Sequence, residues 1–149
     1  MDRRQYGTMA IMAGLGILLA GIVVIATRRR VEVPAENSTF DAVRIAGEII
    51  RLRIDGTDSG PRRRALRTAA VKLADSPFSR ALVAFADGNL EAAAREPAQS
   101  PFAAGLRGWV LIELGRLPEA SEALRSALNE SQDDWEFRPL FEAALRKAG

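Results

Sequence analysis

The chain contains neither cysteine nor histidine among its 149 residues, and only two lysines accompany nineteen arginines. The absence of cysteine excludes disulfides, thiolate nucleophiles and cysteine-based metal sites. The absence of histidine removes the commonest general base and metal ligand. No glycine-rich phosphate loop, nucleophile elbow or pair of catalytic carboxylates is recognisable. We therefore expect no catalytic residue, no metal and no cofactor, and a binding or assembly role rather than an enzyme. The preference for arginine over lysine suggests a GC-rich bacterial genome.

One long apolar run dominates the N-terminal part. Residues 9–26 read MAIMAGLGILLAGIVVIA, without a charged side chain, and Arg28, Arg29 and Arg30 follow almost at once. A helix over residues 6–27 would be about 33 Å long, enough to cross the hydrocarbon core of a bilayer. No small-x-small cleavage site closes the run, which favours a retained signal anchor over a cleaved signal peptide. We expect a tail at 1–5 and a transmembrane helix at 6–27.

Small residues are concentrated on part of this helix. Ala10 with Gly14, and Gly16 with Ala20, form two small-xxx-small pairs, a pattern that allows another membrane helix to approach closely. The alternative is that glycine and alanine are simply frequent in transmembrane helices. The three arginines that follow are expected to contact anionic lipid.

The position of the arginines also bears on orientation. Arg28, Arg29 and Arg30 favour a cytoplasmic soluble domain by the positive-inside rule, although Arg3 and Arg4 oppose them on the other side. Many bacterial proteins with an N-terminal anchor place their domain outside, so both orientations remain open. The expected location is the bacterial cytoplasmic (inner) membrane, with a single pass.

The positive charge of the chain belongs to the membrane-flanking segment. When residues 1–30 are set aside, 16 basic and 18 acidic residues remain, a formal charge of −2 for residues 31–149. A nucleic-acid-binding domain would carry a basic patch in this part. We therefore expect no nucleic-acid partner.

Helical periodicity begins after a polar linker at 28–38. Ser38 and Asp41 fit a capping box, and a helix to about residue 55 would turn one apolar face inward. That face comprises Phe40, Val43, Gly47, Ile50 and Ile54. A second helix at 62–74 follows Pro61 and is strongly basic. Its basic residues, which either face solvent or contact lipid or a partner, are Arg62, Arg63, Arg64, Arg67 and Lys72.

An internal repeat follows. Ser76-Pro77-Phe78 recurs as Ser100-Pro101-Phe102, and each triplet provides an N-cap serine and a first-turn proline. Gly88 and Gly115, 27 residues apart, each end one helix shortly before the next begins. A last helix is expected to be capped by Ser131, with Asp133, Asp134 and Glu136 in its first turn. Its apolar stripe would be Leu140, Phe141, Ala144 and Leu145.

Residues 101–134 resemble the tetratricopeptide repeat family. The residues that carry the resemblance are the small residues Gly108, Ala120 and Ala127, the turn glycine Gly115, and the large residues Leu111, Leu117 and Leu124. Ala104 departs from the pattern, because the family usually has tryptophan there. The resemblance implies an all-α fold. Residues 39–149 would form a tetratricopeptide-like α-solenoid of about three helix hairpins plus a capping helix, behind the transmembrane helix.

The same resemblance implies a concave groove that binds partner segments. Transferred position by position, its lining would be Phe78, Leu82, Phe85, Phe102, Gly105, Trp109, Ile112 and Glu113. Such an apolar surface is typical of a binding site. The alternative is that the short array closes on itself and these residues form core.

Two functions fit these features. The first is a scaffold or accessory subunit that stabilises a larger membrane protein complex, such as a respiratory or photosynthetic assembly. The second is an assembly factor or chaperone-like module that binds client proteins in the groove. In both, the partners are integral or peripheral membrane proteins together with membrane lipid.

Overall fold

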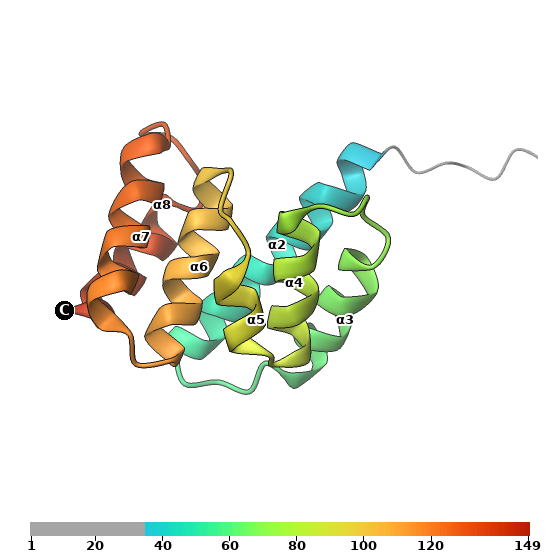
Figure 1. Ribbon diagram of the computed structural model, residues 1–149, viewed down its shortest axis with the longest axis horizontal. Coiled ribbons are helices and arrows are strands. Elements are labelled where there is room, and N and C mark those ends of the chain that lie inside the picture. The colour runs from blue at the N-terminus through green and yellow to red at the C-terminus, as the bar shows by residue number, and fades with distance from the viewer. Residues whose placement is uncertain (1–34) are drawn as a thin grey trace, which may run out of the picture. The chain divides into compact units, whose positions relative to one another are not determined.

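The computed structural model describes residues 35–149, which contain seven helices and no strand (Figure 1). The helices are α2 (Ala35–Ile54), α3 (Gly60–Ala70), α4 (Pro77–Asp87), α5 (Leu90–Arg95), α6 (Pro101–Glu113), α7 (Leu117–Glu130) and α8 (Arg138–Ala148). The expectation of an all-α fold is confirmed for this part of the chain. No helix within residues 35–149 is both long enough and apolar enough to cross a membrane. The predicted anchor at 6–27, its small-residue pairs and Arg28, Arg29 and Arg30 lie outside the described residues and remain predictions.

The repeated serine–proline signals begin two helices as predicted. The Ser76 hydroxyl accepts a hydrogen bond from the Ser79 backbone N–H at 3.1 Å, and the Ser79 hydroxyl accepts one from the Ser76 N–H at 3.0 Å. Ser100 accepts from the Ala103 N–H at 3.2 Å in the same way. Each cap satisfies backbone donors that the first helical turn leaves without a partner.

The two predicted turn glycines end α4 and α6. Gly88 has φ 77° and Gly115 has φ 74°, in the left-handed region that costs glycine little and other residues more. The backbone N–H of the residue after each glycine donates to a carbonyl of the helix that has just ended. For Asn89, the acceptor is the Ala84 carbonyl at 2.8 Å. These bonds keep both connections short, so α4–α5 and α6–α7 are tight hairpins.

The sequence prediction for α2 was wrong in its start and correct only in part for its buried face. The helix begins at Ala35 rather than after Ser38, so the last residues of the predicted linker are helical. Phe40, expected in the core, is 57% exposed. Gly47 and Ile50 of the predicted face are buried, and Val43 and Ile54 pack partly buried against the core. The buried stripe also includes Ala42, Ile45, Ala46 and Ile49. This stripe also has helical spacing, and its alanines allow α6 and α8 to pack closely against it.

The starts and ends of two other helices also differ from the prediction. Helix α3 ends at Ala70 rather than at 74. Helix α8 begins at Arg138, and the Ser131 hydroxyl donates to the Leu128 carbonyl at 3.0 Å, closing α7 instead of capping α8. The three acidic residues expected in the first turn of α8 therefore lie in the loop that precedes it. The apolar stripe of α8 is as predicted, with Leu140, Phe141 and Ala144 buried.

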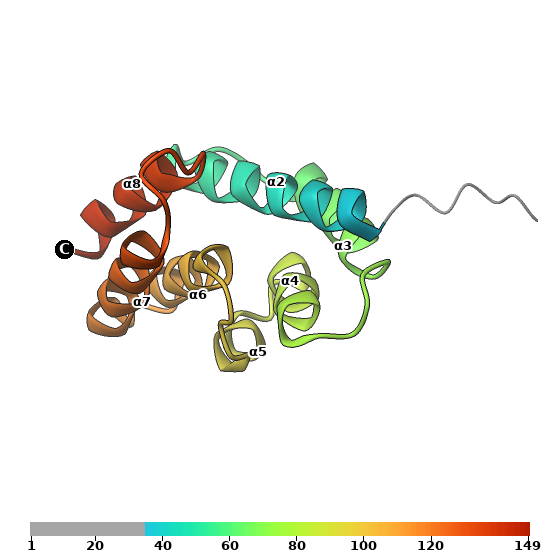
Figure 2. The ribbon, with the colours of Figure 1, turned by 90° about the horizontal axis from the view of Figure 1, so that it is seen from above.

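Each helix packs against the next one along the chain, and α2 also contacts α6 and α8. In Figure 2, α2 and α8 lie along one side of the helical unit, with α4, α6 and α7 beneath them. Aromatic side chains fill the space near α8. The ring centroids of Phe102 and Phe141 are 5.6 Å apart, and Trp135 stacks on Phe141 at 5.4 Å. The first and last described helices thereby cover the face that α4 and α6 share.

Close helix contacts depend on two glycines of α6. A Cβ on Gly108 would lie 2.6 Å from Cγ of Leu124 in α7. A Cβ on Gly105 would lie within 2.6 Å of ring carbons of Phe141 in α8. Both positions bring α6 nearer to its neighbours than a larger residue allows.

Candidate interaction sites

The side chains predicted to line the concave groove are mostly core. Leu82 and Phe85 have no exposed surface, and Phe102 and Trp109 are buried. Gly105 is buried as well, and the partly buried residues are Phe78, Ile112 and Glu113. The prediction of an open groove is therefore corrected for the described residues, and the alternative of a closed array agrees with their burial. The physical reason is that α2 and α8 occupy the face that a longer solenoid would leave open.

Glu113, one of the predicted partner-binding residues, is instead paired within the helical unit. Its carboxylate forms an ion pair with the Arg53 guanidinium of α2, and the two side chains are 15% and 23% exposed. The same guanidinium lies 5.7 Å from the ring centroid of Phe85 and donates from Nε to the Ser59 hydroxyl at 3.2 Å. Arg53 thus connects α2 with α4, α6 and the start of α3 through one side chain.

A solvent-open groove of about 570 Å³ runs between α3, α4 and α5, and we call it the outer groove. Its apolar lining comes from the end of α3, from α4 and from α5, and comprises Val71, Leu73, Val83, Ala84 and Ala92. Val71, one of these lining residues, is 57% exposed. An exposed apolar depression of this kind is typical of a site at which another chain binds.

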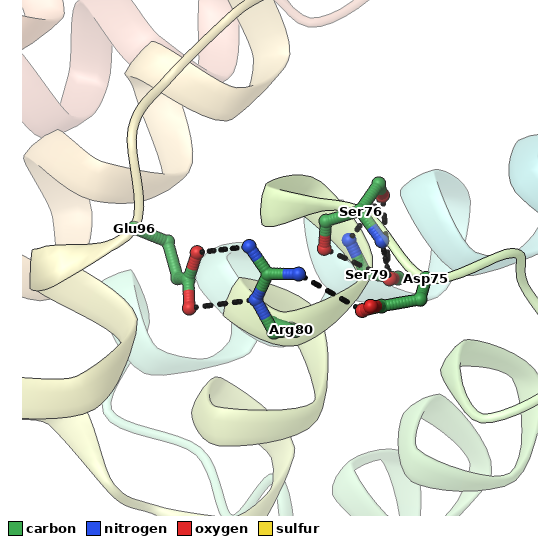
Figure 3. Close-up of polar contacts among 5 residues, drawn as sticks. All are labelled: Asp75, Ser76, Ser79, Arg80 and Glu96. Atoms are coloured by element: carbon green, nitrogen blue, oxygen red, sulfur yellow. Dashed lines mark hydrogen bonds and ion pairs between the residues drawn. The ribbon is translucent and has the colours of Figure 1, made fainter.

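Charged side chains line the rim of the outer groove (Figure 3). Arg80 of α4 donates to both carboxylate oxygens of Glu96, from Nε at 3.0 Å and from Nη2 at 3.1 Å. Its Nη1 donates to Asp75 at 2.9 Å. The pKa of Arg80 is raised, mainly by the hydrogen bond to Glu96 and to a smaller extent by the hydrogen bond to Asp75. The fork joins α4 to the residue after α5 and to the α3–α4 connection along the rim of the groove.

The basic helix α3 is partly neutralised by neighbouring helices. Arg62 pairs with Glu48 of α2 at 3.2 Å, and Arg67 pairs with Asp87 of α4 at 2.7 Å. Arg64 and Lys72 are exposed and form no ion pair within residues 35–149. The basic face is therefore divided between internal pairing and free cationic side chains.

A second, more polar groove of about 340 Å³ lies against α6 and α7. Glu119, on its wall, accepts from Arg116 Nε at 2.9 Å. This hydrogen bond, opposed in part by desolvation, lowers the pKa of Glu119. No group of three or more carboxylates within residues 35–149 is arranged to hold a metal ion.

The lowered pKa gives a testable pH dependence. At a pH above the pKa of an ordinary glutamate, the ionised Glu119 side chain stabilises the folded state. This stabilisation is lost as the pH falls through the lowered pKa of Glu119 in the folded protein. We expect Glu119→Gln to be less stable than wild type at neutral pH, and we expect this difference to shrink as the pH falls below the pKa of an ordinary glutamate. Urea unfolding, followed by tryptophan fluorescence across this range, measures the difference. A difference that does not change with pH would contradict the assignment.

Comparison with family models, with curated proteins and with solved structures finds no match for this chain.

The outer groove and the Arg53 contacts were not predicted from the sequence. Val83 lies between Leu82 and Phe85, which are both core, so α4 carries apolar residues on two faces. Apolar residues on a second face of α4 were the one sequence signal for a second apolar surface. Nothing near Arg53 in the sequence distinguishes it from Arg51, which is exposed.

Proposed function

We propose that the protein is a non-enzymatic, membrane-anchored scaffold or accessory subunit of a larger membrane protein complex. The apolar run at 6–27 holds it in the bacterial cytoplasmic membrane, and the helical unit binds a segment of a neighbouring membrane protein. The observation that carries the proposal is the outer groove, which combines apolar lining with a charged rim in which Arg80 binds Glu96. The small-residue pairs in the anchor would provide a second contact with the same complex.

We further propose that the helical unit is a scaffold of the tetratricopeptide kind. Three features support this interpretation. The family's small positions at Ala120 and Ala127 have no exposed surface, Gly108 allows α7 to approach α6, and Gly115 forms the turn between these two helices. The shortened α5, which ends before Pro97, makes the preceding hairpin irregular.

The position of the partner's binding site separates the two functions. An assembly factor that holds clients in the concave face would need α2 or α8 to move away from α4 and α6. A scaffold that binds through the outer groove needs no such movement. Because the outer groove is already open, we favour the scaffold.

Val83→Glu tests the groove. Val83 is half-buried at the groove wall and packs against the edge of the core. A carboxylate there places a charge against an apolar partner, and circular dichroism checks that the helical unit remains folded. We expect at least a tenfold loss of the co-purifying membrane proteins, measured by quantitative mass spectrometry after mild-detergent extraction. The matched control is Leu117→Glu, a charge at an exposed apolar residue that does not line this groove. Equal retention of partners by both variants would exclude the outer groove as the contact.

A further inference from the structure

One end of the helical unit brings together two segments that are distant in the sequence. The first turns of α2 and the α3–α4 connection, residues 71–76, lie side by side at this end in both views (Figures 1 and 2). The preceding part of the chain joins the helical unit here, because α2 begins at Ala35, directly after Pro34.

Exposed apolar side chains are concentrated in the same two segments. Within residues 35–149 three large hydrophobic side chains are strongly exposed: Phe40 at 57%, Val71 at 57% and Leu117 at 39%. Phe40 lies in the second turn of α2, and Val71 is the C-cap of α3. Leu117 begins α7, on the far side of the helical unit in both views. Two of the three therefore belong to the end at which the chain enters.

The predicted anchor places this end near the bilayer. Seven residues, 28–34, separate the predicted transmembrane helix from α2. Even fully extended they reach at most about 25 Å, at about 3.3–3.6 Å per residue. The end that carries Phe40 and Val71 is thus tethered close to the lipid headgroups, where a weak affinity for lipid is sufficient because the tether keeps the local concentration high.

The charges at this end are compatible with a lipid surface. Lys72, next to Val71, is exposed and forms no ion pair within residues 35–149, so its ammonium is available to a headgroup phosphate. Two exposed carboxylates near this end are each beside an arginine: Asp75 with Arg80 at 2.9 Å and Asp41 with Arg44 at 3.9 Å. This pairing reduces the repulsion that they would otherwise experience from anionic lipid.

We propose that Phe40, Val71 and Lys72 form a membrane-contacting surface that docks the helical unit directly onto the bilayer. The aromatic and aliphatic side chains insert into the interface, and the lysine contacts headgroup phosphates. The helical unit is then attached at two points, and the part of the outer groove lined by Val71 is held at the membrane surface. The proposal rests on the membrane anchor of the proposed function.

Site-directed spin labelling of the full chain tests this surface. Because the chain has no cysteine, Phe40→Cys, Val71→Cys and the control Leu117→Cys each carry a single nitroxide. All three positions are exposed, so the labels should leave the fold intact, which circular dichroism checks. Each variant is reconstituted into vesicles of phosphatidylethanolamine and phosphatidylglycerol. Relaxation by oxygen, which partitions into lipid, is then compared with relaxation by a water-soluble nickel chelate.

We expect the labels at 40 and 71 to be more accessible to oxygen than to nickel, and the label at 117 to show the reverse. A chain that floats with the vesicles but has all three labels in water would overturn the docking surface and leave the anchor intact. Labels at 40 and 71 that neither reagent reaches would indicate contact with a second copy and would also overturn the proposal. A full chain that does not float would contradict the anchor itself, and this proposal with it.

Discussion

Replacement of Gly105 by alanine is expected to destabilise the helical unit by about 1–3 kcal/mol, the cost typical of an overpacked core. In an ordinary helix interior the same change is stabilising by about 0.5–1 kcal/mol, because alanine is the better helix former. At this position the new methyl group would lie within 2.6 Å of Phe141 ring carbons, which are also packed by Phe102 and Trp135. The ring has little room to withdraw, so the steric cost exceeds the gain in propensity.

The measurement uses the two tryptophans, Trp109 and Trp135, which both belong to the helical unit. Their fluorescence follows urea unfolding of the full chain in a mild detergent and reports this unit. The control replaces Phe141, which faces Gly105, by a smaller residue. In a Phe141→Leu background, Gly105→Ala should lower the free energy of unfolding by clearly less than it does in wild type. If Gly105→Ala stabilised the wild-type chain, α8 would not be packed against α6 as described.

Replacement of Arg53 by methionine is expected to cost about 2 kcal/mol, in the range for a buried polar group that loses its partner. The carboxylate of Glu113 is 15% exposed and would lose the guanidinium that pairs with it. The Phe85 ring would also lose its cation contact, which is worth about 0.5–1 kcal/mol. Methionine retains most of the aliphatic volume, so the loss reports charge rather than packing.

A matched pair on the same helix provides the control for Arg53. Arg44 pairs with Glu48 at 2.8 Å, but its side chain is 51% exposed, and Arg44→Met should cost no more than about 0.5 kcal/mol. The double variant Arg53→Met with Glu113→Gln should recover part of the loss, because no unpaired charge then remains. Equal costs for Arg53→Met and Arg44→Met would contradict a connecting role for Arg53.

The starts of α4 and α6 and the turns after them could be predicted from the sequence because their causes are local. A serine hydroxyl caps the N–H three residues later, proline suits the first turn, and glycine adopts the positive φ that ends the helix. Each of these signals lies within a few residues of the structure that it determines. They therefore required no knowledge of the rest of the fold.

The buried face of α2 could not be predicted in this way because two stripes on that helix are apolar. The predicted stripe, which includes Phe40, Val43 and Ile50, was assigned from the helical period. The packed stripe contains Ala42 and Ala46, whose small size matters only once α6 and α8 lie against it. Tertiary packing centred the buried face on these alanines, kept Gly47 and Ile50 buried, and left Phe40 exposed.

The prediction of a concave binding groove was wrong for a related reason. The family resemblance describes hairpins stacked in an open array, and it assigned Leu82, Phe85, Phe102 and Trp109 to a binding surface. The resemblance does not say whether an array of only a few hairpins stays open or closes on itself. In this chain α2 and α8 cover that face, so residues that would bind a partner in a long array become core.

The most direct test of the account is the purification of the tagged full chain from its native membrane in mild detergent, with absolute quantification of every co-purifying protein. A membrane-anchored accessory subunit predicts a small set of integral membrane proteins at a constant ratio to the tagged chain. A broad set of proteins at low and variable ratios would contradict the subunit and favour an assembly factor. Recovery of the chain from the soluble fraction, without membrane proteins, would contradict the anchor and with it the proposed function.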